Sequence, residues 1–194
     1  MNHFWRAAFT RVSAAAALVG TIVAGSVIGV LLTEAEAGLG GILIQGVGAG
    51  VCSFVLFSAI IASVNTLHLM GNLARFGLSS ADASLSVHSA RTLTVPLVHG
   101  LQEHRIVESS LQNLGQLKGV SLETKHADDG EASAVCAGLK GGNVLLELAI
   151  SRGADCYEVS IEVRPENSWK KLNGGASWTA AELAASAVLR SVGE

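Results

Sequence analysis

Hydrophobic positions follow two different patterns along this chain, and the change between them comes near residue 78. Two apolar runs, residues 12–33 and 41–64, contain no Asp, Glu, Lys or Arg. A helix needs about 20 consecutive apolar residues to cross the hydrocarbon core of a bilayer, and each run is long enough. We therefore expect residues 1–78 to form a two-helix transmembrane hairpin whose second helix extends toward residue 76.

After the hairpin, apolar and polar residues alternate, which is typical of strands with one buried face. Tyr157 to Arg164 is the clearest example. Strands are predicted over 92–97, 120–125, 131–140, 144–150 and 157–164, with a helix over 99–117. A final helix is predicted to start near Thr179, whose spacing to Glu182 is that of a capping box.

This order predicts an α+β domain over residues 91–194. Because each strand has one apolar and one polar face, the sheet of about five strands should be antiparallel and covered by the two helices on one face. The sequence leaves the pairing of the first strand open. Residues 79–90 are expected to be a linker or an edge strand.

The charges that flank the apolar runs predict the topology. Arg6 and Arg11 precede the first run, Arg75 and Arg91 follow the second, and the link over 34–38 holds two acids and no base. By the positive-inside rule, both termini and the domain should be cytoplasmic.

An alternative is that residues 1–37 are a signal peptide cleaved after Ala35-Glu36-Ala37, which would leave one anchor. The apolar run is longer than is usual for a signal peptide, and it starts too early for an organelle transit peptide.

Small residues recur at helical spacing in both runs. They are Gly20, Ala24, Gly25 and Gly29 in the first run, and Gly46, Gly50 and Ser53 in the second. Small residues let membrane helices approach closely, so these faces are predicted to pack helices together. They could join the two hairpin helices to each other, or join the hairpin to a membrane partner or a second copy. Neither run holds a charged residue at mid-depth, which disfavours ion or proton transport.

Composition excludes further classes of function. From residue 79 onward, ten Lys and Arg stand against fourteen Asp and Glu, which gives no electrostatic footprint for nucleic acid. Cys52, Cys136 and Cys156 lack the spacing of a zinc site, and so few cysteines favour a reducing compartment. A Cys136–Cys156 bridge stays open if the domain is exported.

Candidate catalytic and metal-binding groups do not converge. His99 and Glu103 share one helix face and His104 and Glu108 another, so the four are expected to be surface residues. No phosphate-binding loop follows the glycine pairs, and Cys136 has no nucleophile signature. The sequence therefore predicts no catalytic residue, metal or cofactor.

The loop over 166–176 is the best candidate for an interaction loop. Trp169, Lys170 and Lys171 combine an aromatic side chain with two cations, which is typical of binding hot spots and of membrane-interface contacts. The alternative is that Trp169 packs over the end of the sheet.

Together these patterns predict a membrane-anchored, non-catalytic subunit or assembly factor. Its partners would be membrane proteins or further copies of the chain, together with the bilayer. One alternative is a tethered enzyme or ligand-binding domain, with Glu147 or His104 turned into a pocket. The other is a self-assembling membrane scaffold.

Overall fold

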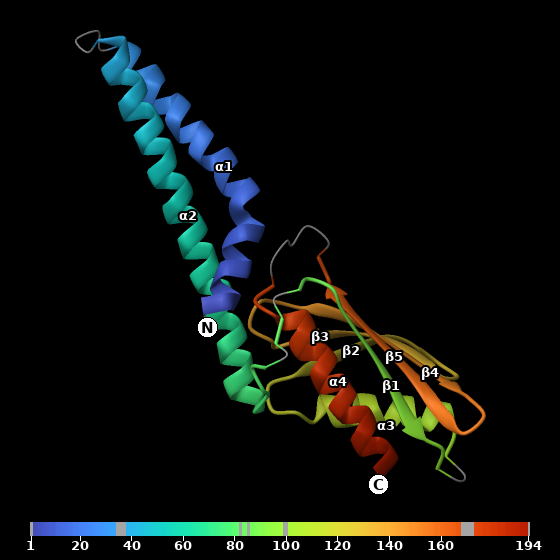
Figure 1. Cartoon of the computed structure of the whole chain (residues 1–194). Helices are drawn as coiled ribbons and strands as arrows, with labels where there is room; N and C mark the ends of the chain where they lie inside the picture. The colour runs from blue at the N-terminus through green and yellow to red at the C-terminus, as the bar shows by residue number, and fades with distance from the viewer. Residues whose placement is uncertain are drawn as a thin grey trace. The chain divides into compact units, whose positions relative to one another are not determined.

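The computed structural model describes residues 2–33, 38–81, 83–84, 86–98, 101–167 and 173–193, without the side chains of residues 2–4. Within these ranges the chain forms four helices and five strands (Figure 1). It divides into two units, Met1–Thr66 and Leu67–Glu194.

Helices α1 (Asn2–Thr33) and α2 (Leu39–Phe76) are the long apolar elements, and the last ten residues of α2 belong to the second unit. α1 begins well before the predicted run because residues 2–11 contain no Gly or Pro to interrupt a helix. α2 ends at Phe76 because the next residue, Gly77, has φ 64°, and the Leu78 N–H donates to the Leu73 carbonyl at 3.0 Å.

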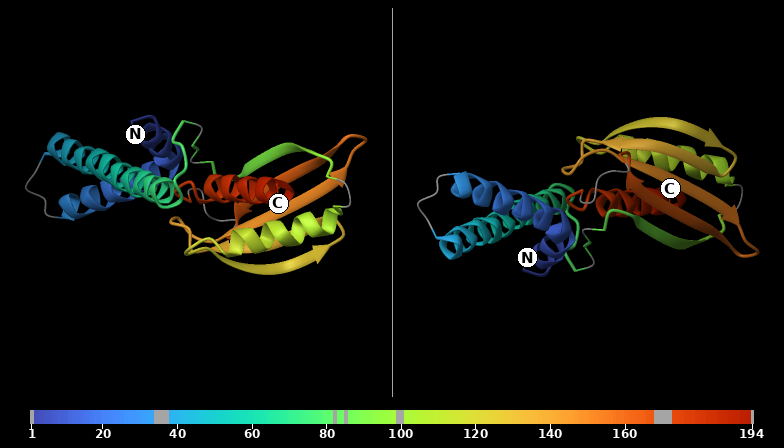
Figure 2. Two further views of the ribbon diagram at one scale, coloured as in Figure 1. Left: turned by 90° about the horizontal axis from the view of Figure 1, so that it is seen from below. Right: turned by 90° about the horizontal axis from the view of Figure 1, so that it is seen from above.

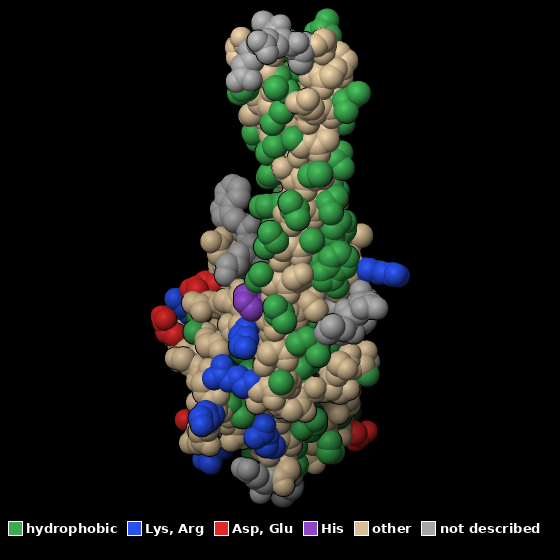
Figure 3. Space-filling view, turned by 90° about the vertical axis from the view of Figure 1, so that its left-hand side faces the viewer, with side chains coloured by type: hydrophobic (Ala, Val, Ile, Leu, Met, Phe, Trp, Pro, Cys, Tyr) green, Lys and Arg blue, Asp and Glu red, His purple; other side chains and the backbone are tan. Residues whose placement is uncertain are grey.

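Both helices are long and apolar enough to cross a membrane. The core helix of a soluble protein can be equally long and apolar, but such a helix is mostly buried. In the most apolar 18-residue stretch of each helix, only 11% is buried in α1 and 17% in α2. Figure 3 shows hydrophobic side chains exposed along the hairpin.

The second unit is built on an antiparallel five-stranded sheet of order β1-β5-β4-β3-β2. The strands are β1 (Ser89–Pro96), β2 (Ser121–Asp128), β3 (Glu131–Ala137), β4 (Val144–Arg152) and β5 (Cys156–Pro165). β1 pairs with β5 through eight consecutive residue pairs, so the first strand lies at one edge. β2 lies at the other edge, where its register shifts between Thr124 and His126.

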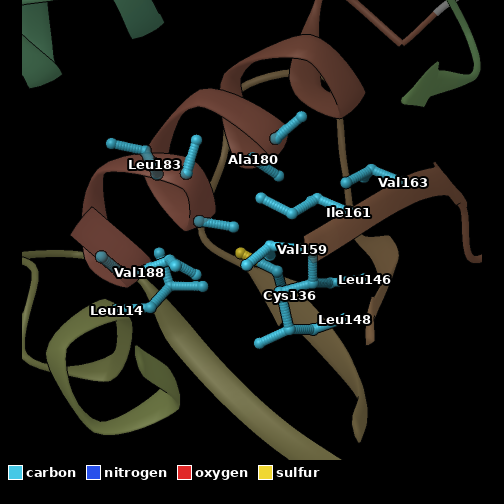
Figure 4. Close-up of a cluster of buried hydrophobic side chains, with 14 of the residues drawn as sticks. Leu114, Cys136, Leu146, Leu148, Val159, Ile161, Val163, Ala180, Leu183 and Val188 are labelled. Carbon is cyan, nitrogen blue, oxygen red and sulfur yellow. The ribbon is translucent and has the colours of Figure 1, made fainter. Parts of the chain in front are cut away.

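Helices α3 (Glu103–Gly115) and α4 (Ala176–Gly193) cover one face of the sheet, as Figure 2 shows. The predicted α+β architecture is confirmed. Apolar side chains from β3, β4 and β5, among them Leu146 and Ile161, point toward both helices (Figure 4), and Val188 of α4 belongs to the same buried cluster. A 2.9 Å hydrogen bond between the Ser110 and Ser191 hydroxyls joins α3 to α4.

The ends of two predicted elements differ from the structure. α3 spans Glu103–Gly115 rather than 99–117, and β3 ends at Ala137 because Gly138 turns the chain with φ 88°. Position 99 lies outside the described residues.

The predicted capping box at Thr179 is wrong. α4 starts at Ala176, whose N–H donates to the Asn173 carbonyl at 2.9 Å. Gly174 and Gly175, with φ of 56° and 73°, form the turn that starts the helix earlier. Thr179 thus lies inside α4, where its side chain is fully buried.

Candidate interaction surfaces

One set of small residues forms the contact between α1 and α2. A Cβ added at Gly50 would lie 2.7 Å from the Gly20 carbonyl oxygen and 2.8 Å from the Ala24 Cβ. A Cβ added at Gly46 would collide with the side chain of Ile28. Because real Cβ atoms do not approach other atoms this closely, the two helices can pack at this distance only with glycine at these positions.

An aromatic cluster supports the same contact near the N-terminal end of α1. Trp5 stacks on Phe9 with 5.1 Å between ring centroids, and Phe9 meets Phe54 of α2 edge-on at 6.3 Å. The Trp5 indole N–H donates to the Ser63 hydroxyl at 3.2 Å. Trp5 and Phe9 precede the uncharged run of α1, in the kind of position where Trp commonly marks a membrane interface.

The remaining small residues predicted to pack helices have other positions. Gly25 and Gly29 are exposed, and a Cβ at either would have no heavy atom within 4 Å. Ser53 is half-buried. Gly25 and Gly29 therefore leave a second small-residue face on the outer side of α1, separate from the contact with α2.

The end of α2, from Leu67 to Phe76, packs within the second unit. Asn72 is fully buried, and its amide accepts a hydrogen bond from the Lys140 N–H and donates one to the Lys140 carbonyl, both at 2.9 Å. The Arg75 guanidinium donates to the carbonyls of Gly138 at 2.9 Å and Lys118 at 3.1 Å. These four hydrogen bonds attach two turns of the domain to α2.

The uncovered face of the sheet is acidic. Glu147 on β4 lies directly opposite Glu162 on β5, and Arg164 donates to Glu147 at 2.6 Å. Small side chains around this pair leave a shallow hollow of about 420 Å³, which His126 and Glu131 also line. The hollow opens on the surface, so Glu147 is not turned into an interior pocket.

His104 is exposed on α3 and lines a groove of about 550 Å³ between α3 and β2, together with Glu108 and Asp128. Within the described residues, no group of three or more His, Cys, Asp or Glu side chains is placed to hold a metal ion.

Each of the three cysteines is free, so the Cys136–Cys156 bridge is not formed. Burial raises the pKa of the Cys136 thiol to about 11. A thiol held neutral in this way is a poor nucleophile. Cys52 is exposed on α2, and Cys156 is half-buried at the start of β5.

The predicted interaction loop of Trp169, Lys170 and Lys171 lies outside the described residues. Comparison of the chain with protein-family models, with curated proteins and with solved structures gives no match.

Proposed function

We propose that this protein is a membrane-anchored, non-catalytic subunit or assembly factor. The α1–α2 hairpin would hold it in the bilayer, and the α+β domain would lie in the cytoplasm with both termini.

The observation that carries this proposal is the outer surface of the hairpin. Large apolar side chains are exposed along both helices, such as Leu18 and Ile22 on α1 and Ile44 and Leu56 on α2. A contiguous apolar surface of this kind is unfavourable in water and marks contact with a membrane or a protein. The uncharged composition of both runs favours the bilayer.

The outer small-residue face of Gly25 and Gly29 supports a partner within the membrane. In lipid, the hydrophobic effect does little to bring helices together. Association with a partner helix therefore depends on van der Waals packing, which the close approach allowed by glycine strengthens. Since α2 already contacts the face of Gly20, the outer face is free to contact a partner helix or a second copy.

Native mass spectrometry of the protein, extracted from its own membrane in mild detergent, tests this proposal. A subunit should be found in a defined heavier assembly. The Gly25→Leu/Gly29→Leu variant should release the partner and keep the hairpin folded. The matched Gly46→Leu/Gly50→Leu variant should disrupt the hairpin itself. Recovery of monomer alone from the native membrane would count against the proposal.

A further inference from the structure

Three positively charged residues from separate segments meet at the C-terminal end of α2. Arg75 is on α2, Lys118 is in the connection from α3 to β2, and Lys140 is in the connection from β3 to β4. All three residues are exposed. We call them the basic cluster.

Hydrogen bonds from α2 hold the cluster together. The Arg75 guanidinium donates to the Lys118 carbonyl, and the buried Asn72 amide bonds to both backbone groups of Lys140. A Cβ added at Gly71 would lie 2.6 Å from the Lys140 ammonium nitrogen, so this cation lies over Gly71. Gly71 and Arg75 are four residues apart and therefore share a helix face.

The cluster is locally positive although the domain as a whole is acidic. The three ion pairs found among the described residues are Arg91–Glu182, Lys125–Glu123 and Arg164–Glu147, and none includes a member of the cluster. Figure 3 shows Lys and Arg side chains gathered on this face of the domain, with Asp and Glu at its margins. An anionic partner would therefore meet cations that are not already neutralised by an ion pair.

The position of the cluster along α2 indicates which anion it meets. Gly71 comes only seven residues after Val64, the last residue of the apolar run, and both belong to α2. Lipid headgroups occupy the layer just outside the hydrocarbon core. The exposed side chains of Leu67 and Met70 extend the apolar surface toward that layer.

We propose that the basic cluster binds the headgroups of anionic phospholipids where α2 leaves the membrane. This inference rests on the proposed membrane anchoring and adds a lipid preference to it. Each Lys or Arg near an anionic surface strengthens binding about fivefold. The contact also explains why Asn72 and Arg75 hold two distant turns against the helix: they bring Lys118 and Lys140 to its side.

The test uses the full chain reconstituted into vesicles of equal phosphatidylcholine and phosphatidylglycerol. The protein is extracted again in mild detergent, and the retained lipids are counted by native mass spectrometry. Wild type should retain phosphatidylglycerol in excess, and Lys118→Gln/Lys140→Gln, which removes two cations, should reduce that excess about 25-fold. Arg75 is left unchanged because it holds two carbonyls in place. The control Lys125→Gln/Arg152→Gln removes two exposed cations elsewhere in the domain and should leave the excess unchanged.

The outcomes separate the two proposals. Wild type that floats with the vesicles and retains both lipids in the vesicle ratio overturns the lipid preference alone. Wild type that does not float with the vesicles overturns membrane anchoring as well. Binding of inorganic phosphate that the Lys118→Gln/Lys140→Gln variant abolishes, without any phosphatidylglycerol excess, would assign the cluster to soluble anions and refute the lipid contact.

Discussion

Although the Asn72 side chain is small, its replacement by alanine should strongly destabilise the α+β domain. The Asn72 side chain makes two 2.9 Å hydrogen bonds to the backbone of Lys140, and Asn72 is fully buried. Loss of two hydrogen bonds costs about 1 kcal/mol each, and the two partly buried backbone groups left without a partner add to this. We expect the free energy of unfolding to fall by about 2–4 kcal/mol. That is a large fraction of the stability of an ordinary domain.

Urea unfolding of the full chain in detergent, followed by near-ultraviolet circular dichroism, measures this loss. Asn72→Asp keeps the acceptor for the Lys140 N–H, but it buries a carboxylate and sets its second oxygen against the Lys140 carbonyl oxygen, so its loss should be at least as large as that of Asn72→Ala. The control is Asn143→Ala, because the Asn143 amide donates to Glu166 at 3.1 Å on the exposed surface. Its loss should stay within about 0.5 kcal/mol. Equal losses for Asn72→Ala and Asn143→Ala would refute the role assigned to Asn72.

Three further predictions concern other parts of the chain. Gly50→Leu should lower the thermal midpoint of the hairpin, measured by circular dichroism in detergent, whereas Gly25→Leu should leave it unchanged; equal effects would contradict the assigned contact. Burial raises the pKa of the Cys136 thiol from 9.0 to about 11, so the unfolded thiol ionises first as the pH rises. The free energy of unfolding should thus fall between pH 9 and 11, by at most about 1.4 kcal/mol per pH unit, and the Cys136→Ala variant should lack this component in a urea titration. Tyr157→Phe removes the hydrogen bond to the Leu101 carbonyl at 2.5 Å and should cost about 1 kcal/mol in the same assay; an unchanged midpoint would show that this bond adds nothing.

The periodicity of the sequence predicted the elements of the domain in their order, and it is clearest in β4 and β5, where every second residue is buried. The alternation from Tyr157 to Arg164 corresponds residue by residue to the burial along β5. The pairing of β1 with β5 could not be read from the sequence, because strand pairing depends on contacts between distant segments. The same applies to the hydrogen bonds between Asn72 and Lys140, which join residues 68 positions apart.

Short-range signals were less reliable at the element ends and in the hairpin. Thr179 has the spacing of a cap, but the turn at Gly174 and Gly175 starts α4 earlier. In the apolar runs, Gly25-x-x-x-Gly29 and Gly46-x-x-x-Gly50 have the same spacing. Only the structure shows that the second pattern meets α1 while the first faces outward. Spacing identifies a close-packing surface without identifying what packs on it.

The two edges of the sheet differ in how they would receive another extended chain. On β2 the register shift near His126 interrupts the regular backbone, and such irregular edges resist strand addition. On β1 the eight pairs with β5 run without a shift, and Ala90, Thr92 and Thr94 are exposed and uncharged. Growth of this sheet by strand addition is therefore one-sided. At high protein concentration, β1 is the edge from which aggregation would begin, and a lysine at Thr92 is the simplest means to block it.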